Sequence, residues 1–519
     1  MKRKLEYFSR VIATTFLFGM MSSIAYAAPY VWPGAAPCNT TLQNCIDNAG
    51  SGDIVEIAAN TVDEDITFDK SLTLRPATGY SPRFINAHRI RANSTGTTDN
   101  FITIQGIVME TGDIIVTHSS SGTFTLNLID NTIEKSFSYG EAIRFWPISG
   151  GKTFFNISSN NITVPSGGQM YGIQIHQQSD TEGNISNNVI VMEGATQGDA
   201  IEVVNMGGSA IVDIIGNTIS GTNMNNGINV YQYTAGCNTD TRIVNNLVTG
   251  QAGNVGGPGA IVYYIIDGHV NLEVVNNTVA DNEEGIMLYC DPGTASGNIA
   301  NNIIANNTKT GLNIYPGIAV AVSNNHNLLY NNVFNSFTPG AGTLYDDPLF
   351  VGGGDYRLQP LSAAVNKGDN ASVPSGVTTD LDGNPRIFGP AVDIGAYECI
   401  ESPVPDIKAN GYDGPITVSS DQAVSITVSL DPGCLAGHNA DWWIAYHKPS
   451  GWLSFVYPDW VDGIQRCLEY PLVGFSPIEL INSTFPPGDY LFCFVVDENP
   501  DDNLDITWFD FVEVNVYAP

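Results

Sequence analysis

Charge is scarce in this sequence, and positive charge is scarcest. Only 14 % of the 519 residues are charged, with 20 Lys and Arg against 53 Asp and Glu, so the formal net charge is −33. Ordinary soluble domains carry about 25 % charged residues. Nucleic acids and anionic membrane surfaces are bound by clustered Lys and Arg. The composition therefore argues against both as partners.

Long apolar runs are missing beyond the N-terminal region. Residues 1–27 have the pattern of a signal peptide, with basic Lys2–Lys4, apolar Val11–Met21 and the small-residue site Ala25–Ala27. An uncleaved anchor is the alternative, although the run is short for a bilayer. We expect a secreted or cell-surface protein without a transmembrane segment in its mature chain.

Cysteine is sparse, and none of the eight cysteines forms a Cys-x-x-Cys pair. A zinc site of that type is therefore not indicated. Cysteines in an exported chain are more often disulfide-bonded. Cys38 and Cys45 are close enough for a local bridge, and Cys237 and Cys290 could meet across stacked turns. The sequence leaves the pairing open for Cys399, Cys434, Cys467 and Cys493.

Asparagine recurs at a regular interval through the middle of the chain. Segments such as IDNTI, SNNVI, IGNTI and VNNTV return every 23–31 residues, on Asn131, Asn161, Asn188, Asn217, Asn246, Asn277, Asn302 and Asn325. A second element, seen in YGIQIH, NGINVY and EGIMLY, alternates with the first. Its small residues are Ala142, Gly172, Ala200, Gly227, Ala260, Gly285 and Gly311. Two patterns that share one period indicate an internal repeat.

Each repeat element alternates apolar and other residues over four or five positions, which is the period of a β-strand. Ile173 and Ile175 are expected inside, and Gln174 and His176 outside. A unit this short buries its apolar face only by stacking on its neighbours. Asn suits the corners, because it tolerates left-handed backbone and its amide can bond to the next coil. The pattern predicts an all-β fold with a parallel β-solenoid.

With its repeats and the opening segments TLQNCI, SGDIVEIA and KSLTLRP, the chain over residues 36–345 resembles the right-handed parallel β-helix proteins of the pectate-lyase-like superfamily. The resemblance implies a helix that caps the first coil. We assign residues 28–344 to the β-helix and its N-terminal cap. The superfamily contains lyases, hydrolases, epimerases, adhesins and structural proteins, so the resemblance points to an architecture and not to one reaction.

Residues 345–400 carry DDPLF, GGGDYRLQP, NKGDNA and TTDLDGNPRIFGPAVDIGAYE. These motifs resemble the segment called a choice-of-anchor Q domain, which in its family follows a β-helix. The resemblance implies an extracellular or cell-surface product. Its Gly- and Asp-rich turns suit irregular coils that close the end of a solenoid.

The sequence pattern changes after residue 400. Residues 401–405 form a Pro-bearing linker. Residues 406–519 contain short alternating runs, among them AVSITVSL, DYLFCFVV and WFDFVEVNV, separated by Pro, Gly and Asp turns. This spacing predicts a C-terminal antiparallel β-sandwich of immunoglobulin-like kind.

Two outward columns follow from the alternation in the second repeat element. The aromatic column lies four residues after each small residue and the polar column two residues after it. The aromatic column is Trp146, His176, Val204, Tyr231, Tyr264, Tyr289 and Tyr315, and the polar column is Arg144, Gln174, Glu202, Asn229, Val262, Met287 and Asn313. Sugar binding needs flat apolar faces beside hydrogen-bonding groups. A ladder of rings that only stabilises the sheet is the competing interpretation.

Arg144, His176 and Glu202 are expected on three successive coils, on the sheet that by resemblance carries the substrate cleft. They are the candidate catalytic residues. A lyase needs a base and a glycoside hydrolase needs two carboxylates, and beside Glu202 the sequence offers only Asp199, Asp180 and Asp291 in nearby turns. Solvated surface side chains are the alternative for Arg144 and His176.

Two acidic loops are candidate calcium sites. One contains Asp380 and Asp382, and the other contains Asp497 and Asp501. Carboxylate oxygens are the ligands that Ca²⁺ prefers. Neither loop has the EF-hand layout, and plain acidic turns are the alternative.

The sequence therefore favours a secreted or cell-surface β-helix protein that binds an extracellular polysaccharide along the aromatic column, and that could cleave it as a lyase or hydrolase. The rival hypothesis is a structural or adhesive surface protein whose β-helix is only a stalk.

Overall fold

The computed structural model describes residues 29–519 except 96, 136–139, 149, 166, 194–197, 223, 252–258 and 316–319. The predicted signal peptide lies outside the described residues. The chain forms two compact units. The first takes in Met1–Pro348, Gly368–Arg386 and Ile394–Tyr397, and the second takes in Leu349–Lys367, Ile387–Asp393 and Glu398–Pro519. The segment 345–400 is thus shared between the two units.

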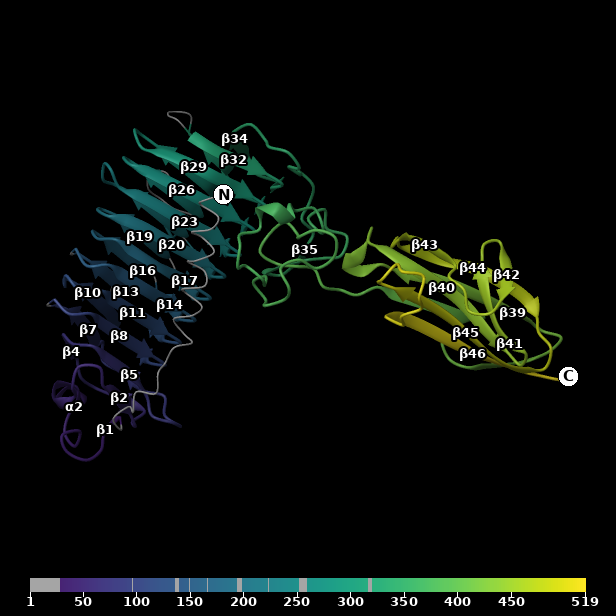
Figure 1. Cartoon of the computed structure of the whole chain (residues 1–519), viewed down its shortest axis with the longest axis horizontal. Helices are drawn as coiled ribbons and strands as arrows, with labels where there is room; N and C mark the ends of the chain where they lie inside the picture. Colours follow the sequence, from purple (N-terminus) through teal and green to yellow (C-terminus); the bar gives the residue numbers. More distant parts are fainter. Residues whose placement is uncertain are drawn as a thin grey trace. The chain divides into compact units, whose positions relative to one another are not determined.

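The first unit contains a parallel β-helix, as predicted. Its described strands form three parallel sheets, A, B and C, to which each coil contributes one strand (Figure 1). Sheet A consists of β1 (Tyr30–Trp32), β2 (Ile54–Ile57), β5 (Leu72–Pro76), β8 (Asn100–Gln105), β11 (Phe124–Ile129), β14 (Thr153–Ser158), β17 (Thr181–Ser186), β20 (Ser209–Ile215), β23 (Asn238–Val244), β26 (His269–Val275), β29 (Thr294–Ala300) and β32 (Val320–Asn325).

Sheet B has the shortest strands. It consists of β3 (Thr61–Val62), β6 (Arg83–Phe84), β9 (Val108–Met109), β12 (Thr132–Glu134), β15 (Asn161–Val164), β18 (Val189–Met192), β21 (Thr218–Gly221), β24 (Leu247–Thr249), β27 (Thr278–Ala280), β30 (Ile303–Ala305) and β33 (Leu328–Tyr330).

Sheet C carries the second repeat element. It consists of β4 (Ile66–Phe68), β7 (Arg89–Ser94), β10 (Asp113–His118), β13 (Gly140–Pro147), β16 (Met170–Gln177), β19 (Ile201–Asn205), β22 (Ile228–Gln232), β25 (Ile261–Ile265), β28 (Glu284–Cys290), β31 (Thr310–Ile314) and β34 (Phe334–Ser336).

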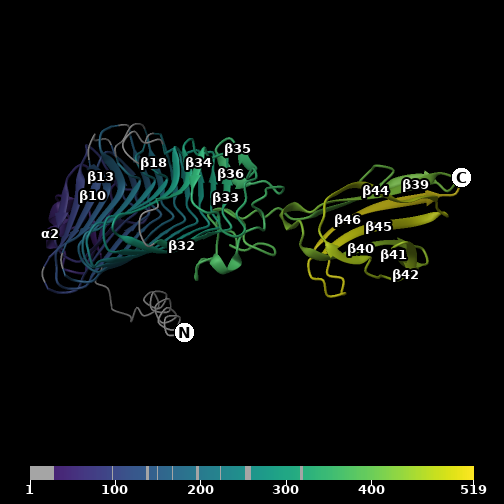
Figure 2. The same ribbon diagram turned by 90° about the horizontal axis from the view of Figure 1, so that it is seen from above.

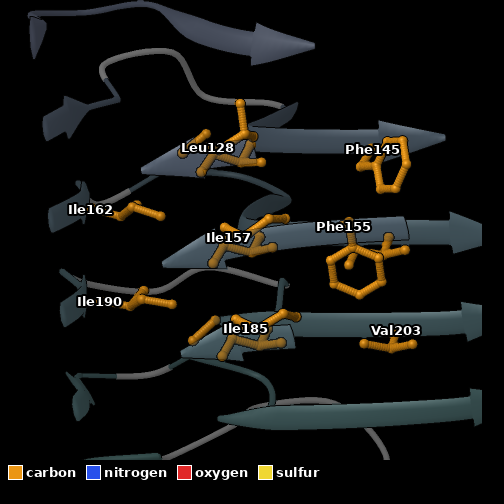
Figure 3. Close-up of a cluster of buried hydrophobic side chains, with 14 of the residues drawn as sticks. Leu128, Phe145, Phe155, Ile157, Ile162, Ile185, Ile190 and Val203 are labelled. Atoms are coloured by element: carbon orange, nitrogen blue, oxygen red, sulfur yellow. The ribbon is translucent and has the colours of Figure 1, made fainter. Parts of the chain in front are cut away.

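Apolar side chains from the three sheets fill the interior of the solenoid in rows. Figure 3 shows Leu128, Ile157 and Ile185 above one another, and they are register partners on β11, β14 and β17. Ile173 and Ile175 are completely buried, as their alternation predicts. The apolar face of each coil is therefore buried in one continuous core that runs through successive coils.

The N-terminal edge is covered by α2 (Leu42–Asn48). The Thr41 side chain accepts a hydrogen bond from Asn44 N, and the Glu64 carboxylate accepts from Leu42 N and Gln43 N. These bonds satisfy amides that lack a partner inside the helix. The expected capping helix is thus present.

A ladder of asparagine amides runs along one corner, as expected from the repeat. The backbone N–H and the Nδ2 group of each member donate to Oδ1 of the next. The members are Asn131, Asn160, Asn188, Asn217, Asn246, Asn277, Asn302 and Asn327. The prediction was wrong at two positions, because Asn160 and Asn327 occupy the ladder in place of Asn161 and Asn325.

The left-handed residue at this corner precedes the ladder asparagine. Asn187, Asn245 and Asn276 have φ of 55°, 56° and 55°. Asn tolerates this conformation better than most residues. The adjacent asparagines of the repeat therefore divide two tasks, since the first turns the backbone and the second bonds to the next coil.

The left-handed asparagines also hold Gly368–Arg386, a segment that belongs to the first unit. Asn301 exchanges hydrogen bonds with the backbone of Asp369. Asn245 Nδ2 donates to Thr379 O, and its Oδ1 accepts from Nη1 of the buried Arg386. The TTDLDGNPR motif is thus anchored on the solenoid by Arg386.

The disulfides partly follow expectation. Cys38 bonds to Cys45, and Cys399 bonds to Cys434. Cys237 and Cys290 are buried free thiols. Cys237 follows β22 and Cys290 ends β28, so the β25 coil lies between them. Two coils span about 9.6 Å, which is beyond the roughly 7 Å limit on the Cα separation for a disulfide.

The second unit contains two sheets around one hydrophobic core, with antiparallel pairing except between β38 and β46 (Figure 2). One sheet consists of β37 (Val404–Ala409), β39 (Ala423–Asp431) and β44 (Phe475–Thr484). The other consists of β38 (Ile416–Ser419), β40 (Asn439–Lys448), β41 (Gly451–Val456), β42 (Asp459–Asp462), β43 (Leu468–Pro471), β45 (Gly488–Asp497) and β46 (Trp508–Tyr517).

Smaller elements complete the described chain. They are the hairpin of β35 (Phe350–Gly352) and β36 (Asp355–Leu358) and the 3₁₀ helices η1 (Asn370–Ser372) and η2 (Gly433–Leu435). Among the described residues, no helix combines the length and the apolarity needed to cross a bilayer.

Candidate functional site

Sheet C aligns the aromatic column on successive coils. The register pairs Val204 with Tyr231, Tyr231 with Tyr264, and Tyr264 with Tyr289. The ring centroids of Tyr231, Tyr264, Tyr289 and Tyr315 follow at 5.8, 5.9 and 5.8 Å. We call these four residues the tyrosine run. It is continuous over four coils.

The tyrosine run is only partly covered. Tyr315 is 42 % exposed, and Tyr231, Tyr264 and Tyr289 keep intermediate exposure. Tyr233, two residues beyond Tyr231, stacks on it at 5.8 Å and is 55 % exposed. Sequence analysis missed Tyr233, although residues two apart on a strand share a face. Part of each side chain is therefore open to solvent.

The polar column differs from expectation, because most of it is buried. Gln174, Asn229 and Asn313 are 5, 5 and 7 % exposed. These amides bond to protein groups instead, as Gln174 does to Glu202 and Asn229 does to Asp199. Val262 and Met287 are buried too, and Gly259 lies beside both. Only Arg144 and Glu202 of this column stay partly exposed.

Arg144 and Trp146 lie on β13, at the N-terminal end of the site. The Arg144 guanidinium lies 4.2 Å from the Trp146 ring centroid, a cation–π geometry. Arg144 Nη1 lies 3.8 Å from Glu141 Oε1. The Trp146 and His176 rings meet edge-on at 6.0 Å. Within the described residues, the buried atoms Arg144 Nε and Trp146 Nε1 have no hydrogen-bond acceptor.

Glu202 contacts two predicted site residues on the preceding coil, Gln174 and His176. Its Oε2 accepts from Gln174 Nε2 at 2.7 Å and lies 3.1 Å from His176 Nε2. The Glu202 and His176 side chains are 13 and 24 % exposed. The structure thus pairs His176 with Glu202, whereas Arg144 contacts Glu141 and Trp146. A carboxylate that orients an imidazole is an arrangement used in acid–base chemistry.

Asp199 is the centre of a hydrogen-bond cluster beside Glu202. The sequence pattern indicates it only as a turn residue near Glu202. It is 2 % exposed. Its Oδ1 accepts from Asn225 and from both nitrogens of Asn226, and its Oδ2 accepts from Asn229 Nδ2. Burial, and then the charge of Glu202, raises the pKa of Asp199 to about 7. No local pattern reveals this cluster, because its amides come from the next coil.

We expect Asp199→Asn to stabilise the protein above pH 7. The folded pKa of Asp199 is raised from 3.8 to about 7, so the ionised form destabilises the fold as pH rises through that window. The full effect is about 4 kcal/mol at about 1.4 kcal/mol per pH unit. The unpartnered Asn229 Oδ1 can turn to accept from the new amide.

Chemical denaturation of both proteins from pH 4 to 8 measures this effect. The two unfolding free energies should be nearly equal at pH 4 and diverge towards pH 8. A difference that is the same at every pH would contradict a raised pKa at Asp199.

The predicted calcium residues serve as turn caps in the structure. Asp380 Oδ1 accepts from Asp382 N and Asn384 N. The carboxylate of the buried Asp497 accepts hydrogen bonds from two backbone amides of its own loop. Asp501 Oδ1 accepts a hydrogen bond from one backbone amide. In the described part of the chain, no group of three His, Cys, Asp or Glu side chains could hold a metal ion. Calcium binding stays a prediction.

Comparison of the chain with protein-family models, with curated proteins and with solved structures finds no match. The pectate-lyase-like and choice-of-anchor Q resemblances therefore rest on the sequence motifs alone, and the parallel β-helix rests on the structure.

Proposed function

We propose that this is a secreted or cell-surface protein that binds an extracellular polysaccharide along the tyrosine run of sheet C. The observation that carries the proposal is the continuous run of partly exposed rings from Tyr231 to Tyr315, spaced 5.8–5.9 Å apart. Sugar rings pack their C–H faces on aromatic side chains, and hydroxyls bond to polar groups at the edge. A glycan chain laid along the solenoid would meet one ring in each coil.

A ring ladder in a stalk is the second candidate, and one observation favours it. Successive rings in the run are tilted by 40°, 56° and 71° and contact one another, and the polar column beside them is largely buried. Rings that stack across strands stabilise a sheet without a ligand. The two functions differ in what loss of the rings should change.

Tyr231→Ala with Tyr264→Ala is expected to weaken glycan binding about 30-fold. Two ring contacts at about 1 kcal/mol each correspond to that factor. A glycan array on the mature protein identifies the ligand, and titration calorimetry measures its affinity. Product analysis with and without calcium tests whether the bound glycan is also cleaved, with Arg144, His176 and Glu202 as the candidate groups.

The matched control is Tyr231→Phe with Tyr264→Phe, which keeps both rings and should keep most of the affinity. If the alanine variant loses thermal stability and no glycan binds either protein, the tyrosine run is a structural ladder and the proposal fails.

A further inference from the structure

The aromatic column has one interruption. Val204 on β19 stands between His176 on β16 and Tyr231 on β22 in the sheet register. A valine is much smaller than the rings on both sides. Glu202 lies two residues earlier on the same strand and therefore on the same face. A notch in the column thus adjoins the Glu202 carboxylate.

The groups at this notch that lack a partner are acceptors. Among the described residues, Glu202 Oε1 accepts no hydrogen bond, since Gln174 and His176 both contact Oε2. Asn229 is the direct register partner of Glu202 and is 5 % exposed. Its Nδ2 donates to Asp199, but its Oδ1 has no donor within the described chain. A buried acceptor without a donor is costly, and Asn229 Oδ1 is such an acceptor beside the partly exposed Glu202 carboxylate.

The surroundings of the notch are also anionic. After burial, the charges of Glu202 and Asp199 are the main causes that raise the pKa of Tyr171 to about 12, and Glu141 adds to them. Three carboxylates thus lie near Tyr171, and Arg144 is a cation on the same face of sheet C. The chain as a whole carries −33. An anionic glycan would be repelled here, whereas a cationic one would be attracted.

We propose that the notch at Val204 seats the protonated amine of an amino sugar, so that the tyrosine run binds a polysaccharide with free amino groups. The inference rests on the proposed function and adds the substrate class. An ammonium group offers three donors and a positive charge, which suits the partly exposed Glu202 carboxylate. The neighbouring His176 and Tyr231 rings flank the sugar, and aromatic faces attract cations.

Calorimetry with two probes of equal length tests the inference: oligomers of glucosamine, and the same oligomers fully N-acetylated. The free-amine oligomer is expected to bind at least tenfold more tightly. Glu202→Gln should remove most of that preference. Raising the salt should narrow the difference as well, because the attraction is screened.

Two further variants make the result specific. Glu182→Gln removes one negative charge from β17 of sheet A, where Glu182 pairs with Lys152, and should leave the preference intact. Val204→Tyr keeps every charge but fills the notch, so it should abolish the preference for the free-amine oligomer. It therefore tests the site independently of whether Glu202→Gln folds.

The outcomes separate this inference from the proposed function. Equal binding of the two oligomers, or equal effects of Glu202→Gln and Glu182→Gln, would overturn the amine site and leave glycan binding standing. If neither oligomer binds and other glycans bind, the amine site alone is wrong. If no glycan binds at all, both proposals fail.

Discussion

Asn217→Ala is expected to lower the unfolding free energy of the solenoid by about 3–5 kcal/mol. Asn217 is completely buried in the middle of the ladder. Its Oδ1 accepts from N and Nδ2 of Asn188, and its Nδ2 donates to Asn246 Oδ1 and Ile185 O. Truncation leaves at least two buried groups unpaired, at about 1–3 kcal/mol each. Chemical denaturation of the protein and its variant measures the loss.

Asn238→Ala is the matched control, because Asn238 lies on β23 of the same solenoid with an exposed side chain. It should change the unfolding free energy by no more than about 0.5 kcal/mol. Hydrogen exchange should show the damage of Asn217→Ala centred on the coils of Asn188 and Asn246. A cost below 1 kcal/mol would mean that water replaces the lost amide and that the ladder is not a main source of stability.

Lys135→Met is expected to lower the unfolding free energy by a similar amount, about 3–5 kcal/mol. The substitution leaves the buried Asp113 carboxylate without its lysine partner. The Lys135 side chain is completely buried, and its Nζ lies 2.7 Å from Oδ2 of Asp113, which is 3 % exposed. Arg89 Nε also reaches this oxygen, at 3.2 Å. Without Lys135, the Asp113 carboxylate keeps this longer contact with Arg89. Urea denaturation of the variant measures the cost.

The double variant Lys135→Met with Asp113→Leu should recover most of the stability, because an apolar pair often replaces a buried ion pair without loss. Lys152→Met breaks the exposed pair with Glu182 and serves as control, with an expected cost below about 1 kcal/mol. Equal costs for the two lysine variants would show that burial does not strengthen the Lys135 contact.

The low charge of the chain is consistent with the ladder. Buried polar groups need partners, and at this corner the amide side chains provide them for one another along successive coils. The solenoid therefore solves its corner hydrogen bonding with neutral residues. The corners therefore need no charged side chains, which is consistent with a charged fraction of only 14 %. The ladder asparagines are buried because each has a partner on the next coil.

The architecture could be predicted because its signal is local and repeated. The alternation in YGIQIH sets which side chains point inward, and the structure buries Ile173 and Ile175 accordingly. The equal period of the two repeat elements places His176, Val204 and Tyr231 in one column, and the register confirms this order. The exact ladder positions could not be predicted, because adjacent asparagines are alike in sequence and only the backbone conformation separates Asn160 from Asn161.

The sequence by itself determined the all-β solenoid, its inward and outward faces and the order of the aromatic column, because alternation and period are properties of neighbouring residues. Only the tertiary structure decided what covers those faces. It buried Asn229 under Asp199, paired His176 with Glu202, and joined Lys135 to Asp113 across coils. Those contacts join residues 22 to 30 positions apart, and they depend on how coils stack and not on any local pattern.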